Sequence, residues 1–251
     1  MNLIKLNNNQ DNNDNVDDET TINSYGKELT DEEKQQRLLS ILNQTKIKDT
    51  AYNAAKYPAG YHTWKLPSAT NSGFEIFKGQ RNCLSRLNAL VRVGKYNLKD
   101  KVILDIGCNQ GACLVHIADK IKYGIGVDNN YELINCANRL SSHFKKQNLS
   151  FYTYDVQVET KNLNRMLTFL PFNKPNIIFL LAVCQWVNNW KELLSWCFQN
   201  SKHLMFEDNG NKQQQLEHQR LLDQLYGSEN IVDLRHRENG RVLLLCCKKD
   251  L

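Results

Sequence analysis

Apolar residues follow two patterns along most of this chain: short continuous runs, and stripes with a spacing of three to four residues. A short apolar run flanked by charge predicts a buried strand, and a stripe at helical spacing predicts an amphipathic helix. The runs predict strands over residues 102–104, 123–128, 150–154, 176–183, 203–206, 231–237 and 242–248. The stripes predict helices over residues 112–121, 131–146, 190–200 and 213–226. This alternation is typical of an α/β fold around a mostly parallel sheet.

The last two predicted strands are joined differently from the others. Only Glu238, Asn239 and Gly240 lie in the connection, and Asn-Gly between two apolar runs is a strong signal for a tight hairpin. We therefore expect the sheet to end in an antiparallel hairpin.

The first 95 residues carry weaker patterns. Residues 1–28 are rich in Asn and Asp and poor in large apolar groups, so we expect a disordered tail. Thr30 and Glu33 have the spacing of a capping box, which predicts a helix to about residue 46. Shorter helices are predicted over residues 51–57 and 82–94.

The aromatic segment between these two shorter helices has no clear period, and such a segment before a binding domain often covers the mouth of the site. The predicted organisation is thus a tail over 1–28, a helical extension with an active-site lid over 29–95, and a cofactor-binding domain over 96–251.

Composition excludes several classes of protein. Hydrophobic residues make up 41% of the chain, enough for a sizeable core, but no apolar run has the length of a membrane span. The N-terminus lacks the basic and apolar segments of a signal peptide. The eight cysteines contain no C-x-x-C pair, which predicts reduced thiols in a cytoplasmic protein and no metal site.

Charge is distributed unevenly along the chain. The first 30 residues hold two lysines and six acidic residues, a balance of −4, so the remainder carries +9 of the total net charge of +5. A basic body is compatible with an RNA partner. Ordinary solvated lysines explain it equally well, because the sequence contains no dense run of Lys and Arg.

The segment after the first predicted strand of the domain carries the clearest chemical signal. It reads Asp105-Ile106-Gly107-Cys108-Asn109-Gln110-Gly111, so an acid and two glycines stand between a strand and a helix. Glycines let the backbone approach a ligand closely, and the start of a helix offers free N–H groups. The dinucleotide pattern G-x-G-x-x-G is absent, and a carboxylate would repel a pyrophosphate but attract a cationic amino group. The alternative is a glycine turn that binds nothing.

This segment resembles motif I of class I S-adenosylmethionine (SAM) methyltransferases, written D-x-G-C-x-x-G, which Asp105, Gly107, Cys108 and Gly111 match. The resemblance implies a Rossmann-like methyltransferase fold with a seven-stranded sheet, mostly parallel and ending in an antiparallel hairpin, and SAM as the cofactor. It implies that Asp105 and the turn from Gly107 to Gly111, Asn109 included, hold the methionine part.

Two further strand ends fit the same resemblance. Asp128 closes the second strand, where a carboxylate can accept both ribose hydroxyls, as in dinucleotide folds. Asp155 and Val156 follow the third strand, at the place where the family often binds the adenine amino group. The alternative for either aspartate is a structural role in a turn.

The lid segment supplies candidates for both ligands. Tyr61-His62 and Gly79-Gln80-Arg81 look like the segment that precedes the fold in a subset of bacterial-type SAM methyltransferases. That resemblance implies that Arg81 pairs with the cofactor carboxylate and that Tyr61 or His62 faces the substrate. Packing of this segment on the core is the alternative.

The ends of the fourth and fifth strands supply the other candidates, because open α/β sheets bind ligands beyond the carboxyl ends of their strands. Gln185 and Trp186 follow the fourth strand, where Trp186 either stacks on a planar substrate or packs in the core. Glu207 or Asp208 could orient a substrate group and accept its proton, or Asp208 or Asn209 could cap the next helix.

The sequence therefore predicts a SAM-dependent methyltransferase. Methyl transfer is a direct displacement that requires alignment and exclusion of water, so it needs neither a catalytic triad nor a metal. His62, Gln185, Trp186 and Glu207 are the candidates on the substrate side. The acceptor is a small molecule or RNA; residues 184–188 are also similar to RNA-end methyltransferases of the bicoid-interacting type.

Two alternatives to methyl transfer stay open at this point. A non-catalytic scaffold that binds SAM or a nucleotide would share the fold, and a nicotinamide-dependent enzyme is disfavoured by Asp105 and the terminal hairpin. The sequence does not predict the oligomeric state.

Overall fold

A seven-stranded sheet forms the centre of the molecule. The computed structural model describes residues 29–44, 61–67, 74–238 and 240–249. The strand order is β5-β4-β3-β6-β7-β9-β8, in which the first five strands are parallel and β9 is antiparallel to both of its neighbours. The strands are β3 (Val102–Ile106), β4 (Tyr123–Asp128), β5 (Leu149–Thr153), β6 (Ile177–Leu181), β7 (His203–Glu207), β8 (Ile231–Glu238) and β9 (Arg241–Cys247). The predicted α/β fold, seven-stranded sheet and terminal hairpin are confirmed.

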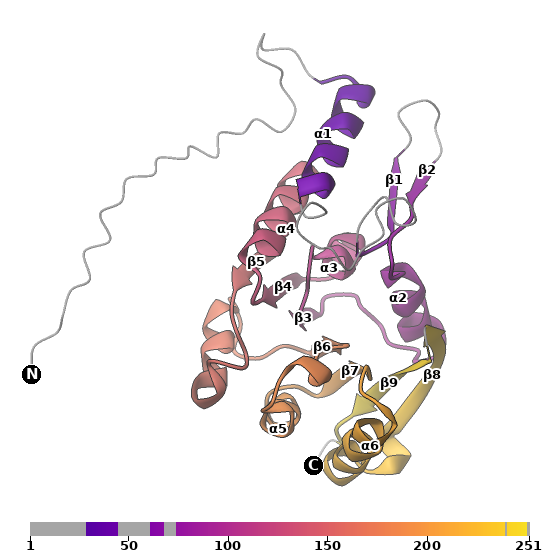
Figure 1. The fold of residues 1–251 in the computed structure, drawn as a ribbon, viewed down its shortest axis with the longest axis vertical. Helices are drawn as coiled ribbons and strands as arrows, with labels where there is room; N and C mark the ends of the chain where they lie inside the picture. Colours follow the sequence, from indigo (N-terminus) through magenta and orange to yellow (C-terminus); the bar gives the residue numbers. More distant parts are fainter. Residues whose placement is uncertain (1–28, 45–60, 68–73, 239, 250–251) are drawn as a thin grey trace, which may run out of the picture.

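Helices cover both faces of this sheet (Figure 1). The helices are α1 (Asp31–Gln44), α2 (Cys83–Arg92), α3 (Ala112–Ile117), α4 (Tyr131–His143), α5 (Trp190–Asn200) and α6 (Lys212–Tyr226). Successive strand residues point to opposite faces, so Ile103 packs in the cluster beneath α2, α3 and α4, and Leu104 packs in the cluster with α5 and α6. The result is a three-layer domain in which both faces of the parallel strands are buried.

The extension before this domain contains one predicted feature and one that the sequence pattern did not predict. The capping box of α1 is present, since Thr30 N donates to Glu33 Oε2 at 2.7 Å and Glu33 N donates to Thr30 Oγ1 at 3.2 Å. The unpredicted feature is an antiparallel pair of short strands, β1 (Trp64–Pro67) and β2 (Phe74–Phe77). The expected tail over 1–28 and helix over 51–57 lie outside the described residues.

A buried tryptophan packs this strand pair on the domain, and a close backbone contact joins the two segments that flank the pair. The side chain of Trp64 is fully buried and stacks on Phe144, with 6.3 Å between ring centroids. Gly79 passes so close to His62 that a Cβ atom there would lie 2.2 Å from the His62 carbonyl carbon. The segment that connects β2 with α2 therefore requires a glycine at this point, because any side chain would separate the two backbones.

The observed elements differ from the predicted ones mainly at their ends. The strand predicted over 176–183 ends at Leu181, because Ala182 adopts a φ of 63° and turns the chain into the short helix η3 (Cys184–Trp186). The helix predicted over 112–121 ends as α3 at Ile117 and continues as the 3-10 turn η1 (Ala118–Lys120). Local steric limits at single residues set these boundaries, and hydrophobic spacing does not register them.

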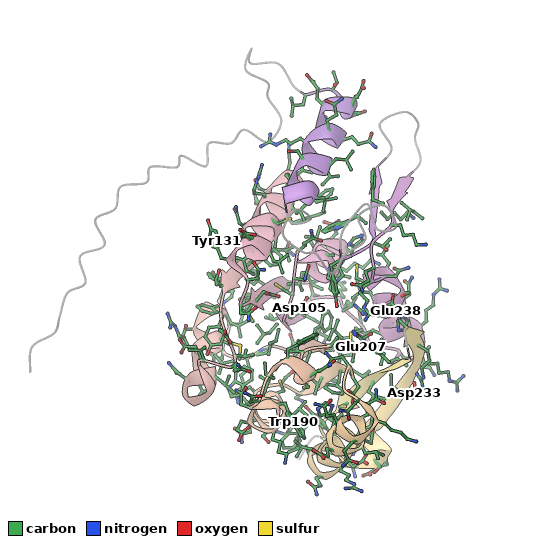
Figure 2. All side chains as sticks on the ribbon, viewed as in Figure 1. Asp105, Tyr131, Trp190, Glu207, Asp233 and Glu238 are labelled. Atoms are coloured by element: carbon green, nitrogen blue, oxygen red, sulfur yellow. The ribbon has the colours of Figure 1, made fainter. Side chains whose placement is uncertain are left out.

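A buried ion pair joins the extension to the sheet. Arg86 of α2 donates from Nε and Nη2 to the two carboxylate oxygens of Glu207 on β7, at 3.0 and 2.9 Å. Both side chains are at most 2% exposed. Arg86 also lies 3.3 Å from Glu238, a partly exposed residue of β8; Figure 2 labels Glu207 and Glu238. The ion pair fixes α2, and the segment before it, against the carboxyl edge of the sheet.

Other features of the described residues bear on the expected class of protein. All eight cysteines have free thiols, and seven of them are buried. Within the ranges that the structure describes, no helix is long and apolar enough to cross a membrane. Over the same ranges, no group of three or more His, Cys, Asp or Glu side chains could hold a metal ion.

The ion pair predicts a large effect on stability. Replacing Arg86 with Met leaves the Glu207 carboxylate buried without its partner, so R86M should lower the free energy of unfolding by about 3–5 kcal/mol. The double variant R86M/E207L removes both charges and should recover most of that loss. Urea unfolding followed by circular dichroism measures both values.

The matched control is K146M, which breaks the exposed Lys146–Asp119 pair and should cost less than about 1 kcal/mol. A loss as small for R86M as for K146M would contradict the structural role of the buried pair.

Candidate active site

A cavity of about 540 Å³ lies at the carboxyl edge of the sheet. Its floor is formed by the residues that follow β3, β4, β5 and β6, so it lies where the strand order reverses between β4 and β6 on either side of β3. Open α/β sheets bind their ligands at this switch point. Its volume falls within the range of small-molecule sites, which is about 300–1,000 Å³.

The turn after β3 forms one part of the cavity floor. Gly107, Asn109 and Gly111 adopt φ values of 75°, 53° and 72°, a conformation that glycine tolerates and asparagine enters more readily than most residues. A Cβ atom on Gly107 would lie 2.5 Å from the Val183 side chain. Gly107 and Asn109 line the cavity, whereas Gly111 lies behind them against Phe151.

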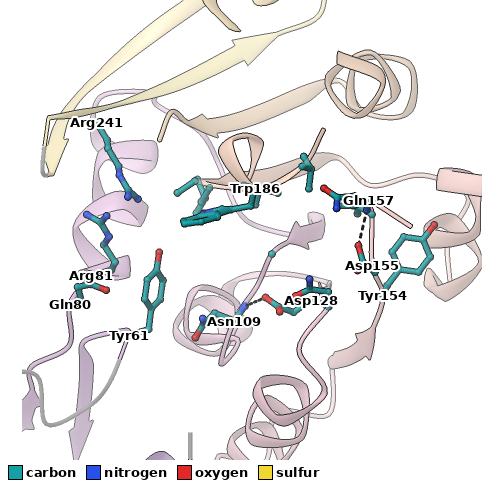
Figure 3. A pocket seen from close by; sticks show the side chains of 17 residues that line it. Tyr61, Gln80, Arg81, Asn109, Asp128, Tyr154, Asp155, Gln157, Trp186 and Arg241 are labelled. Carbon is teal, nitrogen blue, oxygen red and sulfur yellow. Dashed lines mark hydrogen bonds between the residues drawn. The ribbon is translucent and has the colours of Figure 1, made fainter. Parts of the chain in front are cut away.

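Asp128 stands at the end of β4 with its carboxylate toward the cavity (Figure 3). Its Oδ2 accepts from Asn109 N at 2.9 Å, and its Oδ1 accepts from Asn130 N at 3.0 Å. Each oxygen keeps a further lone pair. Partial burial raises the pKa of Asp128 above its ordinary value. The carboxylate is thus held by two backbone donors and can accept two hydroxyl groups of a ligand.

Asp155 and Val156 lie farther along the same side of the cavity, after β5. Asp155 Oδ1 accepts from Gln157 N at 2.8 Å, which closes a turn and fixes the carboxylate beside the cavity. Val156 is buried and forms part of the wall. The structure therefore brings Gly107, Asn109, Asp128, Asp155 and Val156 together, as the sequence analysis expected.

Asp105 does not lie at the cavity surface. It occupies the interior of β3, between Gly126 of β4 and Phe179 of β6, and only 2% of the residue is exposed. Burial, with a smaller contribution from the Asp128 carboxylate, raises the pKa of Asp105 to about 8. The expected position at the strand tip is corrected by one residue, because β3 continues to Ile106.

Cys108 also lies beneath the cavity rather than in it. The thiol is buried, and burial raises its pKa well above the ordinary value. A Cβ atom on Gly126 would lie 2.7 Å from Cys108 Sγ, so the small side chain fits against a glycine of the next strand. Cys108 therefore supports the turn from below.

The lid segment forms the wall opposite Asp155. Tyr61, Gln80 and Arg81 line the cavity, and the backbones of Tyr61, Thr63 and Arg81 are joined by two hydrogen bonds of 2.7 Å. His62 is buried and does not line the cavity. Burial, followed by the charge of Arg86, lowers the pKa of His62 well below its ordinary value, so the imidazole is neutral.

Trp186 is the exposed aromatic residue of the site. It lines the cavity and 72% of it is exposed, so packing in the core, one of the two alternatives for this residue, is ruled out. Gln185 is exposed beside it but does not line the cavity; its N–H donates to Asn209 Oδ1 at 3.2 Å.

The polar residues at the end of β7 all contact other parts of the protein. Glu207 is fully buried in its pair with Arg86 and does not line the cavity. Asp208 pairs with His218 at 3.0 Å, and Asn209 donates to the carbonyl of Ala182 at 2.7 Å. Neither Asp208 nor Asn209 caps α6, contrary to the expected alternative. Asn211 is the cap, in a capping box with Gln214.

Among the charged residues that line the cavity, Arg241 was not predicted from the sequence. Arg241 is the first residue of β9 and lines the cavity across from the lid. The Asn-Gly signal predicted the hairpin that carries it, but a local turn pattern does not say which side chain faces a site formed by other strands.

Comparison with known proteins shows the family to which the chain belongs. The family model described as a methyltransferase domain matches residues 78–242, more than half of the chain. No curated protein sequence matches the chain.

Among solved structures, the chain is similar to the N-terminal domain of EvdMO1 with SAH bound, at a TM-score of 0.54 and 12% identity, over 67% of this chain and 82% of that chain. It is also similar to a precorrin 8W decarboxylase from Methanobacterium thermoautotrophicum, at a TM-score of 0.50 and 17% identity, over 67% of this chain and 91% of that chain. At these identities the likeness is one of fold.

The raised pKa of Asp105 predicts a pH-dependent cost to stability. Between its ordinary pKa and about 8, the unfolded chain has lost the Asp105 proton and the folded chain keeps it, so stability falls as pH rises. D105N abolishes this cost. Its free energy of unfolding relative to the wild type should therefore increase by up to about 1.4 kcal/mol per pH unit within that window.

Urea unfolding of both proteins at several pH values measures the difference. The control is D119N, because the Asp119 side chain is 81% exposed and its difference from the wild type should stay nearly constant. A difference for D105N that does not grow with pH would contradict a buried, neutral Asp105.

Proposed function

The chain belongs to the methyltransferase-domain family, and on that premise we propose how its cavity holds S-adenosylmethionine and a methyl acceptor. The protein is a SAM-dependent methyltransferase with a Rossmann-like class I fold. The observation that carries the proposed site is the Asp128 carboxylate, fixed at the end of β4 beside the turn from Gly107 to Gly111.

In the proposed arrangement, the cofactor lies across the ends of β5, β4 and β3. Asp155 and Val156 face the adenine, and Asp128 accepts hydrogen bonds from the two ribose hydroxyls. Gly107 and Asn109 contact the methionine part, because the positive φ values there bring the backbone itself to the cavity.

The carboxylate of the cofactor is assigned to Arg81 in the lid. Two observations support this assignment: Arg81 lines the cavity beside Gln80, and its Nε and Nη1 atoms are buried without a hydrogen-bond partner among the described residues. A carboxylate is the group that a guanidinium binds with two parallel hydrogen bonds.

Asp105, Cys108 and Gly111 take a supporting role in this proposal. They lie directly under the turn rather than on its surface, so their size and burial set its position. Asp105 additionally places an ionisable group beneath a site for a cation, and a positive charge above it favours its ionised form.

Catalysis in this site consists mainly of alignment. When bound, SAM supplies a methyl group that its sulfonium already makes electrophilic. The chain contributes the walls: Val183 and Ala182 on one side, and the lid residues Tyr61 and Arg81 on the other. Holding the acceptor in line between these walls and excluding water lowers the barrier without a charged base in contact with the acceptor.

The candidates on the substrate side follow from their positions. We assign Trp186 to contact with the acceptor, since it is exposed at the cavity mouth. We assign His62 and Glu207 to positioning, since both are buried behind the wall, and Gln185 to neither role. We assign the described residues between 29 and 95 to the extension and lid, and those between 96 and 249 to the cofactor domain. Eight free thiols support a reducing, cytoplasmic compartment.

Loss of the Asp128 carboxylate tests the proposed cofactor site. D128N keeps the size of the side chain but loses one acceptor and the negative charge, so SAM should bind roughly 10- to 100-fold more weakly. Isothermal titration calorimetry with SAM, SAH and NAD measures the affinities. D119N, which changes an exposed aspartate, should bind SAM like the wild type.

A transfer assay with the same variants distinguishes a methyltransferase from a scaffold that only binds SAM. Methyl label from SAM should enter a small-molecule or RNA fraction with the wild type and not with D128N. Tight NAD binding, or SAM binding unaffected by D128N, would contradict the proposed site. SAM binding without transfer to any fraction would favour the scaffold.

A further inference from the structure

We infer that the methyl acceptor is a small molecule that carries an anionic group, a carboxylate or a phosphate, bound by Arg241. This inference rests on the proposed function, because it assigns the part of the cavity that the cofactor does not use. Its basis is the distribution of charge along the cavity wall.

The two ends of the cavity have opposite charge. Asp128 and Asp155 lie at the end that the proposal gives to ribose and adenine. At the other end, Figure 3 shows Arg81 and Arg241 reaching toward each other from opposite sides, with Tyr61 and Trp186 next to them. Arg81 belongs to the lid and Arg241 to the terminal hairpin, so two separate segments direct a guanidinium to the same place.

The nearby carboxylates do not neutralise both guanidinium groups. Glu207 uses both of its oxygens for Arg86, and its Oε2 lies 3.7 Å from Arg241 Nη1, beyond hydrogen-bond distance. Glu238 Oε2 lies 3.3 Å from Arg86 and 4.0 Å from Arg81. Three guanidinium groups thus share two carboxylates, which leaves one positive charge in excess.

Unused donors mark the position of that excess charge. Among the described residues, Arg241 Nη1, Arg81 Nε and Arg81 Nη1 are buried atoms without a hydrogen-bond partner. A buried donor without a partner costs about 1–3 kcal/mol, and more when it is charged. A ligand with anionic oxygens would satisfy these donors, whereas a neutral or cationic ligand would leave them unpaired.

The unpaired donors lie on two different guanidinium groups, and SAM supplies one carboxylate. The proposed cofactor site assigns that carboxylate to Arg81, a lid residue that lines the cavity and is 3% exposed. Arg241 has a side chain that is 20% exposed, so it is reached from the mouth of the cavity. It therefore remains for the second ligand.

The size of the site favours a small acceptor over a polynucleotide. Arg241 and Arg81 both line one cavity of about 540 Å³, and they do not form a stripe along a surface. Polynucleotide recognition uses several phosphate contacts spread over an exposed basic face. The exposed ring of Trp186 at the mouth provides an apolar surface for the rest of the acceptor.

Matched pairs of simple aromatic compounds test the inference on the intact protein with saturating SAH, in a buffer free of phosphate. Benzoate and phenyl phosphate carry the two anionic groups, and benzamide and benzyl alcohol are neutral compounds of similar size. By calorimetry, at least one anionic probe should bind about tenfold or more tightly than the neutral compounds. The preferred anion distinguishes a carboxylate from a phosphate acceptor.

Variants connect that preference to Arg241. R241Q should weaken binding of the anionic probe by about tenfold or more, and R241K should retain part of the affinity for that probe. Neither variant should change the affinity for SAH. The control is R235Q, on the same hairpin, where Arg235 is exposed and does not line the cavity. R235Q should behave like the wild type with every probe.

Several results would overturn the inference while leaving the cofactor site intact. In two of them the protein binds SAH, but it binds charged and neutral probes equally tightly, or it binds no anionic probe at all. In the third, R241Q leaves the affinity for the anionic probe unchanged. Methyl label that enters RNA equally well with the wild type and R241Q would also overturn it. Failure of the wild type to bind SAH would contradict the proposed function, and this inference with it.

Discussion

The buried ion pair between Arg86 and Glu207 is the contact on which the layout of the site depends. Both charges are removed from water, so each is stable only in the presence of the other, and this restricts α2 to one position on β7. The residues just before α2 form the lid wall, and Glu238 beside the pair belongs to the hairpin that carries Arg241. One electrostatic contact therefore orients both segments that close the cavity against the strands that form its floor.

The floor itself follows from the rules of parallel sheets. Strand order reverses on either side of β3, which opens a crevice at the carboxyl edge, and Gly107 after β3 brings the backbone itself to that crevice. Charge then divides the cavity, with aspartates after β4 and β5 and guanidinium groups on the closing segments. In the proposed arrangement, this division gives the cofactor one orientation, with its carboxylate at Arg81, and leaves Arg241 for the acceptor.

Much of the fold and part of the site were predictable because their signals are local. Buried strands, the capping box of α1, the glycine turn and the terminal hairpin each depend on residues close together in the sequence, and all are confirmed. Glu207 was predicted to follow the strand that it in fact ends, and its partner Arg86 is 121 positions away, a contact that no sequence spacing reveals. The same limit applies to Arg241, whose side chain faces a cavity formed by distant strands, and to the β1–β2 pair. Asp105 was displaced by one residue because the apolar run gives no exact end for β3.

The hydrogen bond between Asn82, just before α2, and Glu238 of the terminal hairpin bears on the order in which the parts of the cavity assemble. The floor residues, from Gly107 to Val183, come from consecutive strand and helix units, whereas Asn82 N donates to Glu238 Oε1 across 156 positions. Closing so long a loop costs more chain entropy and slows contact formation. The chain is synthesised from its N-terminus, so the strands that form the floor precede the hairpin that carries Arg241. The floor and this wall of the cavity therefore become available at different stages of chain growth.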